Sequence, residues 1–463
     1  MRHVARPAFL AVLLTSPWLL AACGGQAGEP HGLEVDGGPG VALDGGPSTG
    51  EGGTADASLP DSGPLLDCSR TAQASTAPPS LYDAFVKELP AITDQLGRDA
   101  RVTKLIADIS AAGGAPLQAP GGDRVVFLVR GAPTAGPWSV AGSFTAWKAN
   151  ALAMTQVAGT DLYVADTHIP HGTAHAYKLL SGTADTGFAE DALASNVVWD
   201  GIDHKTVGYF NGVVHAEDGD KTKGRIVAKR HVHAAMLGDD RDVFVYLPPK
   251  YDDGSCAVLP HLLVHDGNES LTRGDFAKKA DETYAAHPEL SAILVFVALS
   301  SQNVRMDEYT FNTPSALADK YGAFLLSELE PQIKSAYRVC GSPDSRGQSG
   351  ASLGGLISTY LAFQHPEEWG YVGAQSASLF WDTNAMITRA GADPKVPVRF
   401  YLDHGCPNDN CIENQNMSTA LTAKGYDVDH VEVAGAQHDW AYWADRFPQM
   451  LTYFRAGKAA CTK

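Results

Sequence analysis

From residue 224 to the C-terminus, short apolar segments alternate with amphipathic ones, and this alternation limits the fold more than any other feature. The apolar segments of strand length are "RDVFVYLPPKY", "LPHLLVHDG", "SAILVFVALS" and "VPVRFYLDHG". Apolar residues recur at helical spacing in "ADKYGAFLLSELEPQIKSAY", "GGLISTYLAFQHP" and "FPQMLTYFRAG". Strands that alternate with helices pair in parallel and need helices on both faces of the sheet. Residues 224–463 are therefore predicted to form an α/β domain with a mostly parallel sheet.

In residues 119–212 apolar and polar residues alternate with a period of two, in place of the pattern described above. "RVVFLVR", "WSVAG", "LYVADTHI" and "HAYKLLSG" are short, and Gly, Pro and Asp separate them, which predicts a small antiparallel β-sandwich. In residues 79–118 apolar residues lie at helical spacing, which predicts two short helices split near Pro90 and Gly97. The connection to the α/β domain, residues 213–223, is short. We therefore expect the sandwich to pack near the cleft of the α/β domain and to narrow it.

Residues 1–23 have the features of an export signal. Arg2 and Arg6 precede the apolar run "AFLAVLLTSPWLLAA", which is too short for a good membrane span. The run ends in Leu-Ala-Ala-Cys at Cys23, which resembles the lipobox of bacterial lipoproteins; the alternative is a plain secretory peptide. Residues 24–78, rich in Gly, Pro and Asp, are predicted to be a disordered linker. We expect an exported protein anchored by a lipid on Cys23 to the bacterial cell envelope, at the outer membrane or cell surface.

The net charge excludes some classes of partner, and the cysteines indicate disulfides. The net charge of -18 argues against nucleic acid and anionic membrane surfaces, so a membrane is expected only through the lipid anchor. In an oxidising compartment, the even number of cysteines beyond the lipobox indicates disulfides. The sequence alone proposes only Cys406–Cys411, which closes a short loop; a C-x4-C metal half-site is the alternative, but no second Cys/His pair has zinc-ligand spacing. The sequence leaves the pairing of the others open: Cys68, Cys256, Cys340 and Cys461.

Two overlapping serine frames lie in "SRGQSGASLGGL". A sharp strand-to-helix turn that exposes a nucleophilic serine needs glycine or another small residue two positions before and after it. Ser352 has Gly350 and Gly354 at these positions, and a helix-compatible run follows directly. Ser349 has Ala351 after it and is followed by more Gly-rich sequence. The frame therefore favours Ser352 as the nucleophile.

A serine nucleophile needs a base and a carboxylate that orients the base. His438 follows the strand-like "DHVEVAG" and precedes the last helix, which is where a doubly wound hydrolase places its histidine. The acid is expected after the preceding strand, in "FYLDHGCPNDNCIENQN". Asp409, at the tip of the cysteine loop, is preferred. Asp403 and Glu413 remain open.

Two backbone N–H groups are needed to stabilise the oxyanion. One is expected from Leu353, the residue after the nucleophile. The other is expected from the loop after "PHLLVHDG", at Gly267 or Asn268.

Four motifs in this order resemble the esterase D / enterochelin esterase family of α/β hydrolases: "HDGNE" at 265–269, "RxxEY" at 305–309, "R…GxSLGGL…HPExWGxVxxQSxS" at 346–378 and "GxxHDWxYW" at 435–443. Ahead of them, Gly142–Trp147 and Tyr177–Leu179 resemble the signature of the early-set immunoglobulin-like domain that precedes the catalytic domain in that family. Trp138 and Trp147 are candidates for stacking on a sugar or catechol ring. The alternative is that Phe144 and Trp147 belong to the core of the sandwich.

The resemblance implies serine-dependent hydrolysis of carboxylic esters, either small molecules or esters linked to polysaccharides. Siderophore, feruloyl, aryl and short-chain esters are the substrate classes, with Ser352 as nucleophile, His438 as base and Leu353 as oxyanion donor. Arg305 and Glu308 would contact the substrate, or else form a purely structural salt-bridged loop. Neither a metal nor an organic cofactor is expected.

Two departures from the family pattern leave other functions open. Gln348 stands in the strand before the serine, where an apolar residue is usual, and the acid loop carries an added cysteine pair. The alternatives are a non-catalytic lipoprotein that binds glycans or siderophores, and an acyltransferase.

Overall fold

The computed structural model describes residues 76–134, 136–182, 187–202, 210–458 and 461. The predicted signal peptide, the lipidation site at Cys23 and nearly all of the predicted linker at 24–78 lie outside the described residues. Within the described part of the chain, no helix has the length and apolar character needed to cross a membrane.

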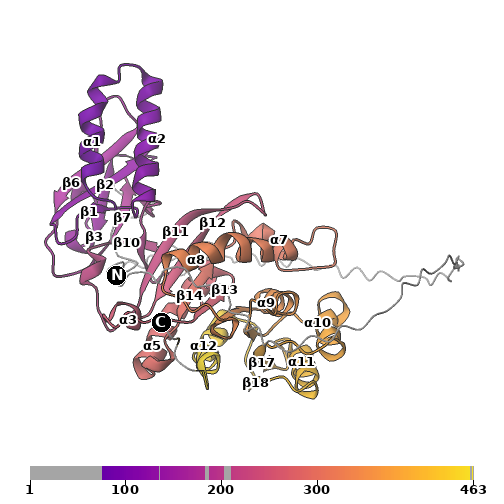
Figure 1. The fold of residues 1–463 in the computed structure, drawn as a ribbon. Helices are drawn as coiled ribbons and strands as arrows, with labels where there is room; N and C mark the ends of the chain where they lie inside the picture. Colours follow the sequence, from indigo (N-terminus) through magenta and orange to yellow (C-terminus); the bar gives the residue numbers. More distant parts are fainter. Residues whose placement is uncertain (1–75, 135, 183–186, 203–209, 459–460, 462–463) are drawn as a thin grey trace, which may run out of the picture. The chain divides into compact units, whose positions relative to one another are not determined.

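A twisted sheet forms the centre of residues 225–434 (Figure 1). Its neighbouring strands run in the order β18-β17-β16-β15-β13-β14-β12-β11. The six strands from β14 to β18 are parallel, whereas β12 and β11 join antiparallel. Their bounds are β11 Arg225–Ala234, β12 Asp239–Leu247, β13 His261–Val264, β14 Ile293–Val297, β15 Arg346–Ala351, β16 Tyr371–Gln375, β17 Arg399–Cys406 and β18 Val428–Ala434.

Helices cover both faces of this sheet, because alternate residues of its buried strands are apolar on each side. Val245 and Leu263 face one core, which α7, η7, α8, α9, α10 and α11 complete. Phe244 and Leu262 face the other, which α4, α5 and α12 complete. The helix bounds are α4 Gly267–Thr272, α5 Phe276–Ala286, α7 Ala318–Ala323, the π-helical η7 Phe324–Leu329, α8 Glu330–Ala336, α9 Leu353–Gln364, α10 Trp381–Ala392, α11 Cys411–Ala423 and α12 Trp440–Arg455. Shorter helices are α3 Pro249–Asp252, η5 Pro288–Leu290, η6 Gln302–Val304, α6 Arg305–Glu308 and η8 Pro343–Ser345.

Residues 117–214 form two antiparallel sheets that share one apolar core. The first has the order β1-β2-β6-β5 and the second β9-β10-β7-β3-β4, with β8 paired to β7. Phe144 stacks on Phe127 of this core, whereas Trp147 is exposed. The bounds are β1 Leu117–Gln118, β2 Arg124–Arg130, β3 Trp138–Gly142, η2 Ser143–Thr145, β4 Leu152–Ala153, β5 Thr155–Gln156, β6 Leu162–His168, β7 His175–Ser181, β8 Phe188–Ala189, β9 Asn196–Trp199, β10 Phe210–Val214 and η4 Ala216–Asp218.

The second of these sheets is continuous with the central one, because Val197 of β9 pairs with Ile226 of β11. The result is a 14-stranded mixed sheet. The prediction of a mostly parallel sheet is therefore wrong for the sheet as a whole and describes only β13 to β18. Backbone pairing between distant segments carries no signal in local periodicity, so the sequence did not indicate this continuity.

The register of the strands shows where the N-terminal sheets attach. Ile226 lies in the row of paired residues that continues through Tyr246, Leu294 and Leu262 to Gly347. Gly347 lies near the start of β15, whereas Ser352 follows the end of this strand. At 3.3 Å per residue, Ser352 is therefore about 13 Å or more from the row of paired residues. This strand pairing therefore lies toward the opposite end of the sheet from the serine turn, and it does not support the expectation that the sandwich narrows the cleft.

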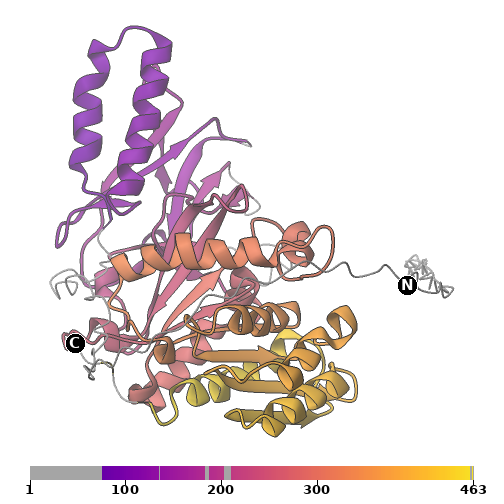
Figure 2. The ribbon, with the colours of Figure 1, turned by 45° about the vertical axis from the view of Figure 1, so that its right-hand side comes forward.

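Two antiparallel helices, α1 Ser80–Glu88 and α2 Gln95–Ala111, lie side by side against the first sheet (Figures 1 and 2). The short helix η1, Leu89–Ala91, ends the first of them at Pro90, as predicted. Gly97, predicted at the break, instead lies in the first turn of α2. Its N–H donates to the Asp94 side chain at 2.8 Å, which caps the helix.

Candidate active site

Ser352 lies on the sharp turn between β15 and α9, with φ 59° and ψ -117°. A positive φ is costly for a residue with a side chain and persists only where the surroundings impose it. Here close packing imposes it: a Cβ on Gly350 would lie 2.7 Å from the backbone of Gly354, and a Cβ on Gly354 would lie 3.2 Å from the Asp266 carboxylate. The glycines two residues before and after Ser352 therefore let strand and helix approach each other, which the serine frame predicts.

The two serines of the overlapping frames occupy different environments. Ser349 is fully buried inside the sheet, where its hydroxyl donates to the Leu263 carbonyl at 3.3 Å. Ser352 is only partly buried, and its Oγ lies 3.2 Å from the Oγ of Ser378. A nucleophile must reach a substrate, so the structure favours Ser352 over Ser349.

His438 and Asp409 are brought together from two loops. His438 lies between β18 and α12, and Asp409 lies between β17 and α11. The His438 Nδ1 is 2.7 Å from the Asp409 Oδ1. A proton on Nδ1 donates to the carboxylate, which leaves Nε2 as the ring nitrogen able to accept another. No hydrogen bond joins His438 to Ser352 among the residues that the structure describes.

The Asp409 carboxylate is buried but remains a good acceptor. Its Oδ2 accepts from the Ser376 hydroxyl at 2.7 Å and from the Gly405 N–H at 2.8 Å. Burial raises the pKa of Asp409, but the hydrogen bonds from His438, Ser376 and Gly405 outweigh it and hold the pKa below its ordinary value. The carboxylate is therefore ionised at neutral pH beside the imidazole.

The two other candidates for the acid have different surroundings. Asp403 accepts from Arg446 Nε at 2.7 Å and from Gln375 at 2.9 Å, and burial raises its pKa to about 6. Glu413 lies in the first turn of α11. Among the described residues, neither side chain hydrogen-bonds to His438, whereas Asp409 does.

A hydrogen-bonded group behind the acid was missed at the level of sequence. Ser376 follows β16 with φ 44°, and its hydroxyl accepts from Trp443 Nε1 at 2.9 Å and from Arg446 Nη2 at 3.2 Å while donating to Asp409. The Trp443 ring also meets the His438 ring edge-on, with centroids 4.9 Å apart. Ser376 and Trp443 lie within "QSxS" and "HDWxYW", so the motifs contained them, but their spacing indicated no role.

The candidate oxyanion donors all lie at helix starts, where backbone N–H groups have no partner within the helix. Leu353 is the first residue of α9, and Gly267 and Asn268 are the first two of α4. The close approach of Gly354 to Asp266, the residue before α4, shows that the two helix starts adjoin. Both candidates for the second donor, Gly267 and Asn268, therefore remain open.

Arg305 binds the residues around these helix starts. Its Nε and Nη2 donate to the two oxygens of Asp266 at 2.7 and 2.8 Å, and Nη2 also lies 3.3 Å from the Ala351 carbonyl. This geometry holds the start of α4 against the strand that ends at the serine turn.

Glu308 does not reach the site. Both of its oxygens accept from Arg241 at 2.9 Å, and its side chain is 1% exposed. A carboxylate so engaged offers nothing to a substrate. These contacts therefore favour the structural alternative for Glu308 over contact with a substrate.

Gln348, the unusual residue in β15, has a buried histidine as its partner. Its Oε1 accepts from His265 Nε2 at 3.3 Å, and the Tyr321 hydroxyl lies 2.9 Å from His265 Nδ1. Burial lowers the pKa of His265 to about 4, so the ring is neutral at pH 7. A polar chain thus replaces the usual apolar contact beneath the serine turn.

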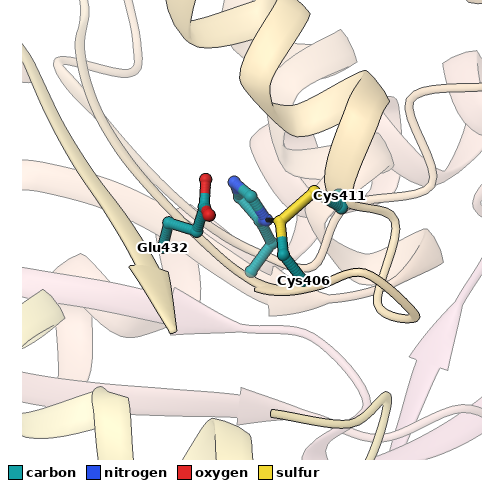
Figure 3. A group of neighbouring side chains, drawn as sticks. Cys406, Cys411 and Glu432 are labelled. Atoms are coloured by element: carbon teal, nitrogen blue, oxygen red, sulfur yellow. Dashed lines mark hydrogen bonds between the residues drawn. A yellow bond between two sulfur atoms is a disulfide. The ribbon is translucent and has the colours of Figure 1, made fainter. Parts of the chain in front are cut away.

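The predicted disulfide Cys406–Cys411 is present and closes the loop that carries Asp409. Glu432 lies close to the two sulfurs (Figure 3), and His404 belongs to the same group. Since the sulfurs are bonded to each other, neither is a thiolate able to bind zinc, and the half-site alternative does not apply to this oxidised state. A second disulfide joins Cys340 to Cys461.

A family model and one curated relative that match this chain are described as esterases. Residues 234–454 match the family model described as "Putative esterase". The iron(III) enterobactin esterase of Dickeya dadantii is 27% identical over 240 residues, which are 47% of this chain and 53% of that protein. The chain therefore spans about half the length of that relative. An uncharacterized protein of Bacillus subtilis, YbbA, is 25% identical over 236 residues, 46% of this chain and 92% of its own.

Solved structures of two esterases are similar at low identity. A ferulic acid esterase is 21% identical with a TM-score of 0.44, covering 50% of this chain and 98% of its own. An enterobactin esterase from Shigella flexneri is 17% identical with a TM-score of 0.42, covering 72% of this chain and 93% of its own. The family match and the sheet with helices on both faces support a hydrolase of the esterase class, with the α/β-hydrolase fold, in residues 234–454.

Proposed function

We propose that this protein is a serine carboxylic-ester hydrolase in which Ser352 is the nucleophile, His438 the base and Asp409 the acid. The observation that carries the proposal is the 2.7 Å hydrogen bond between His438 and Asp409, together with the strained turn that exposes Ser352. The family match to esterases agrees with this chemistry.

In this mechanism His438 Nε2 takes the proton of the Ser352 hydroxyl as Oγ attacks the acyl carbon. Negative charge then develops on the carbonyl oxygen, and the Leu353 N–H with that of Gly267 or Asn268 stabilises it. His438 returns the proton to the leaving alcohol, which departs and leaves an acyl group on Ser352. Water, deprotonated by the same imidazole, releases the acid.

Asp409 contributes by orienting the imidazole and by stabilising its charged form. Its low pKa keeps it ionised throughout the cycle, so Nδ1 holds its proton and Nε2 is free to exchange one. Ser376 and the Gly405 N–H hold the second carboxylate oxygen, which fixes the direction of the first. The Ser352 hydroxyl must turn from Ser378 to His438 when substrate binds, since apo geometry is often looser than that of the reacting complex.

The proposed substrates are short-chain, aryl, siderophore or feruloyl-type esters. The enterobactin esterase relative supports the siderophore class by its name. Between Leu353 and His438 the described chain consists of β16, β17 and β18 with α9, α10 and α11, which leaves no long apolar insertion of the kind that covers a lipase site. The proposed ester is either a small molecule or linked to a polysaccharide.

Labelling with a fluorophosphonate, followed by peptide mapping, tests catalysis and identifies the serine together. We expect one adduct on Ser352, lost in Ser352→Ala and retained in the matched control Ser349→Ala. The proposal would be contradicted if the fluorophosphonate did not label the wild-type protein and the wild type also failed to hydrolyse p-nitrophenyl acetate. That result would favour the non-catalytic binding protein.

We further propose that the protein is exported and anchored through a lipid on Cys23. The lipobox-like end of the apolar run supports this. Mass spectrometry of the N-terminal peptide from a membrane fraction should find an acylated Cys23, and Cys23→Ala should move the protein out of that fraction. A wild-type N-terminal peptide that carries no lipid would contradict the proposal.

A further inference from the structure

Two histidines and two carboxylates meet at one end of the N-terminal sheets, far from the proposed active site in sequence. His171 follows β6 of the first sheet, and His215 follows β10 of the second. Glu217 and Asp218 lie in η4, directly after His215. The rings of His171 and His215 are 3.8 Å apart between centroids.

His171, His215 and Asp218 bring donor atoms within 4.8 Å of one another, and Glu217 lies beside the two histidines. His171 Nδ1 lies 2.8 Å from Asp218 Oδ2 and 3.8 Å from Glu217 Oε1, and His215 Nδ1 lies 3.7 Å from the same Glu217 oxygen. Four ligands arranged tetrahedrally around zinc at its usual bond lengths are about 3.4 Å apart. The observed separations lie on both sides of this value, so a modest adjustment of the side chains would accommodate the ion.

His215 gives the second, independent observation. Its side chain is fully buried, and its Nε2 lies 2.8 Å from the Ile169 carbonyl, to which it can only donate. The proton is therefore on Nε2, and Nδ1 carries a lone pair. That Nδ1 has no hydrogen-bond partner among the described residues. A buried imidazole with one nitrogen tied to a carbonyl and the other unsatisfied is the usual arrangement of a metal-ligating histidine.

We propose that His171, His215, Glu217 and Asp218 bind a divalent transition-metal ion, Zn²⁺, at the junction of the two N-terminal sheets. Two imidazoles and two carboxylates form a donor set that suits zinc. Since His171 belongs to the first sheet's loop and the other three residues to the segment after the second sheet, the ion would cross-link the two sheets. The role is structural, and it is independent of the proposed esterase chemistry.

No pattern in the sequence indicates this site, and the sequence predicts no bound metal. Zinc sites are recognised from sequence by ligands at short, regular spacing. Here only His215, Glu217 and Asp218 are neighbours in the chain, and His171 reaches them because the two sheets pack face to face.

The test is zinc binding by the full-length protein, stripped with a chelator, reloaded and passed through a desalting column before metal analysis. We expect about one zinc per chain, and binding at least tenfold weaker in His215→Gln and Glu217→Gln, since loss of even an outer partner costs that much. Glu217 is partly exposed, so Glu217→Gln keeps the test valid if His215→Gln does not fold. The matched control is His233→Gln, which breaks an exposed His–carboxylate pair of the same 2.8 Å length that lacks a second histidine.

Thermal unfolding gives a second measurement. Zinc at about one hundred times the wild-type dissociation constant should raise the melting temperature by roughly 5–10 °C in the wild type and in His233→Gln, and by about half as much or less in Glu217→Gln. A protein that retains no zinc, or equal zinc content in Glu217→Gln and the wild type, would overturn the proposal. In the first case the cluster is only an ion pair between His171 and Asp218.

Discussion

Replacing Asp409 with asparagine changes one atom of the proposed triad, and the structure determines how the new side chain is held. The Gly405 N–H and the Ser376 hydroxyl approach the carboxylate at Oδ2. A backbone N–H can only donate, so the amide oxygen must take this position. The amide nitrogen then faces His438 Nδ1, where the carboxylate oxygen now lies at 2.7 Å.

An amide nitrogen is a donor, so it forces His438 to accept at Nδ1 and to carry its proton on Nε2. In that tautomer the ring cannot take the proton of Ser352. The same wrong-tautomer effect lowers kcat about 10⁴-fold in serine proteases, which corresponds to about 5.5 kcal/mol of transition-state stabilisation. We expect a loss of this size for Asp409→Asn, with KM changed much less.

The assay is steady-state hydrolysis of p-nitrophenyl acetate, with circular dichroism and thermal melting to confirm that the variant folds. Glu413→Gln is the matched control and should stay within about twofold of the wild type, since among the described residues His438 is hydrogen-bonded to Asp409 and not to Glu413. If Asp409→Asn kept activity within tenfold of the wild type while Glu413→Gln lost it, the acid would be Glu413. The assignment of the triad would then be wrong.

Four further predictions follow from the same site. Ser352→Ala should lose nearly all hydrolysis and Ser349→Ala should keep it, measured on the same ester; the opposite result would show that the serine frame was misread. The value of kcat/KM should fall on acidification, because the base must be unprotonated to accept the proton of Ser352, whereas the lowered pKa of Asp409 keeps that carboxylate ionised; a flat profile between about pH 5 and 8 would contradict His438 as base. Reducing Cys406–Cys411 should lower kcat more than it raises KM, because the bond closes the acid's loop; unchanged kinetics after verified reduction would remove that role. Rates should drop steeply for acyl chains beyond about eight carbons, since an uncovered cleft can hold little chain at roughly 0.8 kcal/mol per methylene; faster turnover of palmitoyl than of acetyl esters would refute this.

The α/β architecture was open to prediction because its determinants are local. Strand-length apolar runs and amphipathic helices each carry their own period, and the glycines around Ser352 report a tight turn directly. Strand ends of one parallel sheet also meet at one edge, which is why chain order was enough to propose both His438 and Asp409.

The structural features that the sequence did not indicate all depend on contacts between distant segments of the chain. The sequence makes Glu308 a candidate for contact with the substrate, but in the structure Arg241 donates to both of its oxygens. His171 and His215 lie in different segments of the chain, and only the packing of two sheets brings them together. The pairing of Val197 with Ile226 belongs to the same group, because edge-to-edge hydrogen bonds have no sequence period.

That last pairing has a consequence for any shortened form of the protein. Strand β9 covers Ile226 and Val227 of β11, an apolar stretch of what would otherwise be the open margin of the central sheet. Farther along β11, an irregularity in the register between Lys229 and Val232 and the basic side chains there disfavour pairing with the strand of another chain. Open apolar margins are templates for association with other chains. A catalytic domain expressed from residue 224 onward would expose this stretch, so we expect it to aggregate through strand-to-strand association even if its active site is complete.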